Sequence, residues 1–65
     1  MSQHEPQSAE DIIFDANLQE FANRVSIICG LESNGKISAA EAYQRIRDLY
    51  KQLKRSKKNL QVGED

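Results

Sequence analysis

Two stretches of the chain carry apolar residues at the spacing of an α-helix, and a turn signal lies between them. In the second stretch the apolar positions advance by four, three and four residues, at Ala42, Ile46, Leu49 and Leu53. The first stretch alternates in the same way, at Phe14, Leu18, Phe21, Val25 and Ile28. Such steps place apolar side chains along one side of a helix. The pattern predicts two helices, at about residues 15–31 and 39–58.

The segment between these stripes predicts a tight connection. Asn34-Gly35 supplies two residues that tolerate a positive φ, so we expect a turn at residues 32–37. Ser38 and Glu41 have the spacing of a capping box, in which each side chain bonds a free backbone N–H near the other. The second helix should therefore begin directly after Ser38.

The N-terminal segment is mostly polar. Residues 1–14 contain few apolar side chains, so we expect a flexible arm. Ile12, Ile13 and Phe14 are the exception, and they could pin the end of the arm onto the hairpin or form a short helical turn capped by Ser8. The first helix would then begin at Asp15 or Asn17, because both residue types are favourable N-caps.

The C-terminal segment also departs from the apolar pattern. Ser56 interrupts the stripe, so we expect close packing as far as Leu53 and a disordered tail at residues 61–65. Together these features predict an all-α fold, an antiparallel two-helix hairpin that forms one domain over residues 15–60.

The predicted hairpin is too small to close a hydrophobic core alone. Chains of 65 residues with one cysteine have neither the buried area nor the disulfides of larger domains. We therefore expect two hairpins to associate as a homodimer, a four-helix bundle. Ala22 and Cys29 widen the first stripe, and we interpret Cys29 as a core residue. The candidate residues for the dimer or partner interface are Phe14, Phe21, Val25, Tyr43, Leu49, Tyr50 and Leu53.

The net charge of −1 hides a strong asymmetry. Residues 1–20 carry five acidic groups and no Lys or Arg, whereas residues 45–58 carry seven basic groups against one acidic group. A fold at the Asn34-Gly35 turn would set Asp15 level with Lys54, so that opposite charges face each other across the hairpin. We favour this structural interpretation. The basic patch consists of Lys51, Lys54, Arg55, Lys57 and Lys58.

The basic patch also supports an alternative function, the binding of nucleic acid or another anion. No aromatic residue that could stack on a base follows Tyr50, and no third helix completes a helix-turn-helix. We therefore do not expect a nucleic acid partner.

Calcium binding is a second alternative. Gly35, Ile37 and Glu41 would occupy positions 6, 8 and 12 of an EF-hand loop. Gly30 would then stand at position 1, where the motif requires a carboxylate. The turn and the helix cap account for the same residues, so we expect no metal site.

The histidine and the cysteine, which are the usual base and nucleophile candidates, do not form a catalytic arrangement. His4 is the only histidine and lies in the predicted arm, while Cys29 has no predicted base beside it. We expect neither an enzyme nor a cofactor. The chain shows no secretory leader and no apolar run long enough to cross a bilayer. With a single cysteine, this favours a reducing, cytoplasmic setting.

Three segments stand out as motifs: Asn17-Leu-Gln-Glu-Phe-Ala, then Asn34-Gly-Lys-Ile-Ser with Glu41-Ala-Tyr, then Lys51-Gln-Leu-Lys-Arg-Ser-Lys-Lys. Through them the stretch from Leu18 to Leu60 resembles a family of short uncharacterised cyanobacterial proteins. This resemblance implies a helical hairpin and brings no activity with it.

Three further patterns are Phe21-x-x-x-Val25, Ser38 with Ala42, and Leu49-Tyr50-Lys51-Gln52-Leu53. They are similar to the phycobilisome degradation protein family, whose small helical hairpins dimerise and bind antenna proteins as proteolysis adaptors. The likeness implies a link to the photosynthetic apparatus. The longer turn, the basic end of the second helix and the lack of tryptophan are departures, so only the Leu49–Leu53 segment carries over as a binding element.

These observations predict a small non-enzymatic protein-interaction module, an adaptor or accessory subunit. The alternatives are an anion or nucleic-acid binder that uses the basic patch, and a degenerate EF-hand-like calcium binder.

Overall fold

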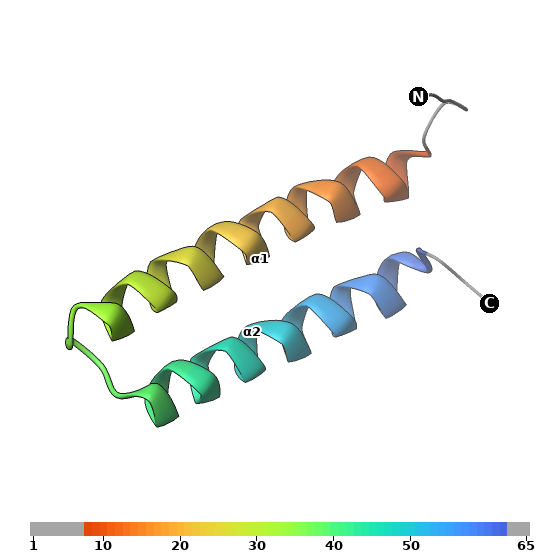
Figure 1. Cartoon of the computed structure of the whole chain (residues 1–65). Coiled ribbons are helices and arrows are strands. Elements are labelled where there is room, and N and C mark those ends of the chain that lie inside the picture. The colour runs from red at the N-terminus through yellow and green to blue at the C-terminus, as the bar shows by residue number, and fades with distance from the viewer. Residues whose placement is uncertain (1–7, 63–65) are drawn as a thin grey trace.

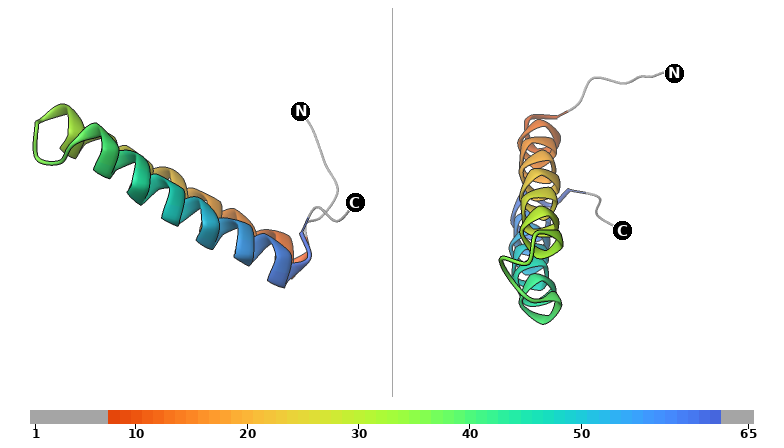
Figure 2. Two further views of the ribbon diagram at one scale, coloured as in Figure 1. Left: turned by 90° about the horizontal axis from the view of Figure 1, so that it is seen from below. Right: turned by 60° about the vertical axis from the view of Figure 1, so that its left-hand side comes forward.

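The chain forms two antiparallel helices that lie side by side along their whole length (Figure 1). The computed structural model describes residues 8–62, in which α1 spans Ala9–Ser33 and α2 spans Ala39–Leu60. Seen from below, one helix lies almost directly behind the other, so the molecule is a single layer (Figure 2). The predicted all-α hairpin is confirmed.

The first helix begins earlier than the sequence pattern predicts. The Ser8 side chain accepts a hydrogen bond from the Asp11 backbone N–H at 3.1 Å, so Ser8 is the N-cap. Glu10 and Asp11 then occupy the first turn, where the positive end of the helix dipole favours acidic groups. The start at Asp15 or Asn17 is therefore wrong, and so is the flexible arm where it covers residues 8–14. Its remainder, residues 1–7, lies outside the described residues.

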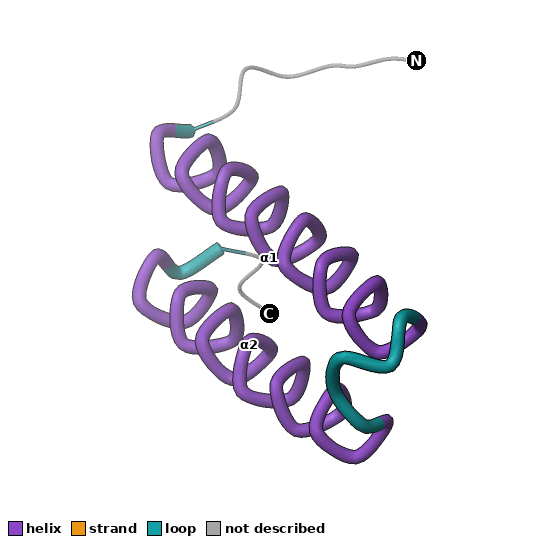
Figure 3. The backbone as a smooth tube through the Cα atoms, turned by 90° about the vertical axis from the view of Figure 1, so that its left-hand side faces the viewer, coloured by secondary structure: helices purple, strands orange, loops and turns teal. Residues whose placement is uncertain are grey.

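The connection between the helices is a five-residue turn, Asn34–Ser38, drawn in teal in Figure 3. Gly35 has a φ of +76°, and its N–H bonds the Glu32 carbonyl at 3.0 Å. The Lys36 N–H bonds the Leu31 carbonyl at 2.8 Å. This pair of bonds is the Schellman motif, which ends helices at a left-handed residue. Glycine adopts that conformation without a steric cost.

The second helix has the predicted start and a longer end. The Ser38 side chain accepts from the Glu41 N–H at 3.0 Å, as the capping-box spacing indicates. At the other end Gln61 has a φ of +58°, and Val62 donates to the Lys57 carbonyl at 3.1 Å. Residues 61 and 62 therefore form a second Schellman motif, and the predicted disordered tail is wrong for both. Residues 63–65 lie outside the described residues.

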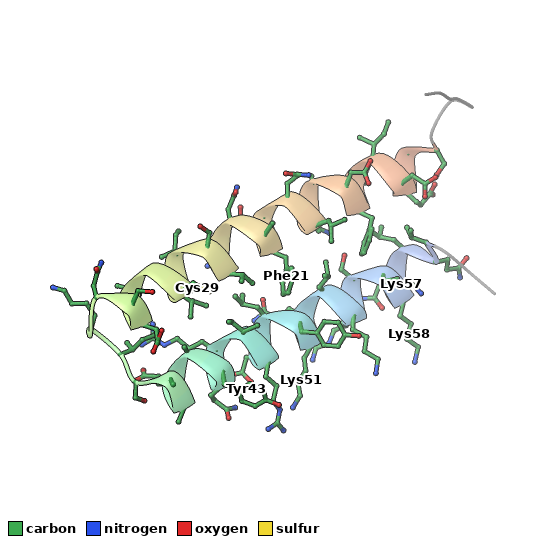
Figure 4. The ribbon with its side chains drawn as sticks, viewed as in Figure 1. Phe21, Cys29, Tyr43, Lys51, Lys57 and Lys58 are labelled. Carbon is green, nitrogen blue, oxygen red and sulfur yellow. The ribbon has the colours of Figure 1, made fainter. Side chains whose placement is uncertain are left out.

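The helices meet along a narrow apolar seam. Ile28 and Ala42 are the buried hydrophobic residues of the described chain, at 7% and 8% exposure. Phe21 points from α1 toward α2 (Figure 4). Half-buried seam positions repeat with helical period on both helices, at Phe14, Asn17, Phe21 and Val25 of α1 and at Ile46, Leu49, Leu53, Ser56 and Leu60 of α2.

A polar pair fixes how the two helices are aligned. The Asn17 side-chain amide donates to the Ser56 hydroxyl at 2.6 Å, in a partly buried position. Ser56 therefore belongs to the seam, and Leu60 continues it, against the prediction that packing stops at Leu53. Because residues 17 and 56 lie level, residue i of α1 lies near residue 73 − i of α2.

This alignment corrects the predicted charge pairing. It sets Asp15 level with residue 58 of α2, one helical turn beyond the expected Lys54. Two ion pairs of the described residues lie within single helices, where Glu20 meets Arg24 and Glu41 meets Arg45, each at 2.7 Å. Exposed pairs of this kind contribute only a few tenths of a kcal/mol each.

The two glycines of the helical region give a matched pair of stability predictions. Gly35→Ala should lower the free energy of unfolding by about 1 kcal/mol, because alanine is strained at a positive φ. Gly30→Ala should raise it by roughly 0.5–1 kcal/mol, because Gly30 lies inside α1 and an added Cβ meets no atom within 4 Å. Urea unfolding at one fixed protein concentration measures both. Equal effects of the two variants would contradict this account of the turn.

The Asn17–Ser56 pair generates a second prediction. Asn17→Leu and Ser56→Ala should each cost about 1 kcal/mol, because each leaves a partly buried polar partner without its hydrogen bond. The double variant should be close to the wild-type chain, since both polar groups are then gone. A double-mutant cycle from urea unfolding gives the coupling energy. Strictly additive single effects would mean that the hydrogen bond does not contribute.

Candidate interaction surface

In the central part of the hairpin, one face consists of apolar residues. Successive residues of a helix are rotated by about 100° around its axis. Counted from Phe21, which lies in the seam, four residues of α1 are rotated to one side. Counted from Leu49, four residues of α2 are rotated in the same sense. In an antiparallel pair, equal rotational senses point to the same side of the layer. We call this surface the apolar face; it comprises Leu18, Ala22, Val25 and Cys29 of α1 with Tyr43, Ile46, Tyr50 and Leu53 of α2.

The opposite face carries more charge but is not wholly polar. Shallow grooves between the helices there are lined by Glu20 and Arg24 of α1 with Arg45, Asp48 and Gln52 of α2, and one groove also by Ile27, which is 63% exposed, Ile28 and Leu31. By the same helical geometry, these groove residues lie on the opposite side of the seam from the residues of the apolar face. Charged side chains thus gather around Ile27 on this side of the layer, whereas the eight residues of the apolar face include no charged side chain.

The largest side chains of the apolar face are open to solvent. Tyr43 is 68% exposed and Tyr50 is 54% exposed, while Leu18 at the edge of the seam is 42% exposed. In Figure 4 the Tyr43 side chain points away from α1. Apolar groups this exposed in a contiguous stripe are typical of interaction surfaces.

The predicted interface residues divide between two surfaces. Phe14, Phe21 and Leu49 are half-buried in the seam between α1 and α2 of one chain. Val25 and Leu53 are half-buried where the seam meets the apolar face, and Tyr43 and Tyr50 are exposed on that face. The stripe read from the sequence therefore contains both the contact within the hairpin and the surface left open beside it.

Cys29 and Ala22 are placed differently from the prediction. Cys29 was expected in the core, but its thiol is exposed, as is Ala22. Both lie about 80° to 100° from the Phe21 position, too far around α1 to reach α2. With Leu18 and Val25 they step by four, three and four residues, and this second stripe was the signal that could have assigned them to a separate face.

The basic side chains of the patch do not line a common groove. Lys51, Lys54, Arg55, Lys57 and Lys58 are all exposed, and at about 100° per residue all of them except Lys57 lie on the side of α2 that is turned away from the seam. In Figure 4, Lys51 and Lys58 point away from α1. The acidic first turns of α1, with Glu10 and Asp11, lie at this same end of the hairpin.

The structure does not form the loop that the calcium alternative requires. Residues 30–33 continue α1, so the segment that would form an EF-hand loop is helical at its beginning. Within residues 8–62, no group of three or more His, Cys, Asp or Glu side chains could hold a metal ion. In the same part of the chain, neither helix is both long and apolar enough to cross a membrane.

Comparison with known protein families gives one match. Residues 7–65 match a family of unknown function, DUF7219. The match spans nearly the whole chain, so the protein belongs to this family. Neither the curated proteins nor the solved structures gave a match.

Proposed function

We propose that this chain is a non-enzymatic protein-interaction module, an adaptor or accessory subunit, that binds through its apolar face. The observation that carries the proposal is the exposure of Tyr43 and Tyr50 on that face. Aromatic residues of this kind are enriched among residues that dominate binding energy at interfaces.

The size of the apolar face supports the same proposal. The apolar face spans residues 18–29 of α1, which is ~18 Å of helix, and two packed helices are about 20 Å wide, so the face covers roughly 350 Å². Exposed apolar patches of a few hundred Å² often mark interaction sites, and stable interfaces bury about 800 Å² on each partner, so the apolar face would form the centre of a larger contact. Meanwhile Ile28 and Ala42 are the hydrophobic residues buried within the described chain itself. Covering the apolar face would therefore add substantially to the apolar area removed from water.

The basic patch has a secondary role in this proposal. Its charges lie mostly on the side of α2 that is turned away from the seam instead of lining a common groove, which favours long-range orientation of an acidic partner over tight anion binding. Nucleic-acid binding through this patch stays the alternative. The cyanobacterial origin, the cytoplasmic location and the link to the photosynthetic apparatus stay predictions from the sequence.

Site-specific photo-crosslinking tests the proposal. A photoreactive phenylalanine analogue at Tyr50 should form covalent adducts in cells that make the protein, because that side chain lies on the apolar face. The same analogue at Gln52, two residues away and on the opposite face, is the matched control and should form few.

Adducts to a second copy of the chain and adducts to another protein would both support association through the apolar face. Equal yields at Tyr50 and Gln52, or adducts at Gln52 alone, would overturn the assignment of that face.

A further inference from the structure

We propose that the apolar face is covered by a second copy of this chain, related by a two-fold axis parallel to the helices. This inference rests on the proposed function and names the partner and its orientation. Each α1 would pack on the partner subunit's α2, and both turns would lie at the same end of a four-helix bundle.

Symmetry fixes the alignment between the two copies. A two-fold axis parallel to the helices moves no residue along the helix direction. Residue i of α1 is therefore level with residue 73 − i of its own α2 and equally of the partner's α2. The hydrogen bond between Asn17 and Ser56 thus sets the contact between copies as well as the contact within one copy.

At that alignment large residues meet small ones. Tyr50 is level with residue 23, so the partner's Tyr50 would lie beside Ala22 and Val25 of α1. By the same rule the partner's Tyr43 would lie beside Cys29. Large side chains of one helix placed against small residues of the next are the basis of close packing in bundles.

The same arrangement also pairs opposite charges at the open end. Glu10 and Asp11 begin α1, and Lys57 and Lys58 end α2, all at the end of the hairpin away from the turn. Stacking α1 on the partner's α2 brings the acidic start of one chain over the basic end of the other. Antiparallel neighbours also place opposite ends of the helix dipoles together. Electrostatic complementarity of this kind sets orientation more than affinity.

The competing arrangement has its two-fold axis across the helices. It stacks α1 on the partner's α1 and α2 on the partner's α2, and it sends the two turns to opposite ends. When this axis passes near Tyr50, the Tyr50 side chains of the two chains lie level with each other. The basic end of α2 then lies over the partner's Tyr43. Neither the charge pairing nor the pairing of large with small residues survives.

Double electron–electron resonance on the full chain distinguishes the two arrangements. Nitroxide labels would be placed at Lys36→Cys in the turn and, in a second sample, at Asn59→Cys at the open end, each in a Cys29→Ser background. Both positions are exposed and lie off the apolar face. Sedimentation equilibrium of the same samples gives the fraction of dimer.

We expect both label pairs to give distances below about 30 Å, because neighbouring helices in a bundle lie 8–10 Å apart. The crosswise axis must give at least one pair beyond about 35 Å, since residues 36 and 59 are separated by about that length of helix. A long distance for either pair would overturn the proposed axis. A monomer at all concentrations would overturn the second copy as the partner, while Tyr50 adducts to another protein would leave the proposed function standing.

Discussion

The structure depends on a seam that only one side of each helix can share. Two helices in one layer bury a single stripe, and in the described chain that stripe contains just two buried hydrophobic residues, Ile28 and Ala42. A third or fourth helix would normally cover the neighbouring stripe. Here Leu18, Tyr43 and Tyr50 lie there in the open. The small buried area and the exposed apolar face thus have the same cause, which is that each helix packs on only one neighbour. Association with a second molecule would bury the exposed face and enlarge the buried area.

Two local features hold the hairpin in one alignment. Gly35 ends α1 in a left-handed conformation at the closed end, and Asn17 bonds Ser56 near the open end. Apolar side chains alone specify alignment weakly, because a stripe shifted by one turn still meets another stripe. A polar pair tolerates no such shift without leaving a partly buried group unpaired. The position of Tyr50 relative to Ala22 on the apolar face follows from this pair.

Sequence reasoning reached the fold because its signals are local. The two stripes, the Asn34-Gly35 turn and the Ser38 cap each lie within a few residues of one another. It placed the start of the first helix too late, because the polar composition of the N-terminal segment favoured an arm and Ser8 was considered only as the cap of a short turn. Ser56 looked like an interruption until its partner on the other helix was known. Cys29 was assigned to the core because a broad apolar stripe does not say where one contact ends and the next face begins.

If the apolar face is covered by association, sedimentation equilibrium over a wide concentration range will show it. Three samples suffice: the wild-type chain, Tyr50→Glu on the apolar face and Gln52→Glu on the opposite face. We expect a dimer for the wild-type chain and for Gln52→Glu, and a helical monomer for Tyr50→Glu, because a buried unpaired carboxylate is costly. A wild-type chain that stays monomeric, or a Tyr50→Glu variant that dimerises as readily as Gln52→Glu, would contradict this expectation.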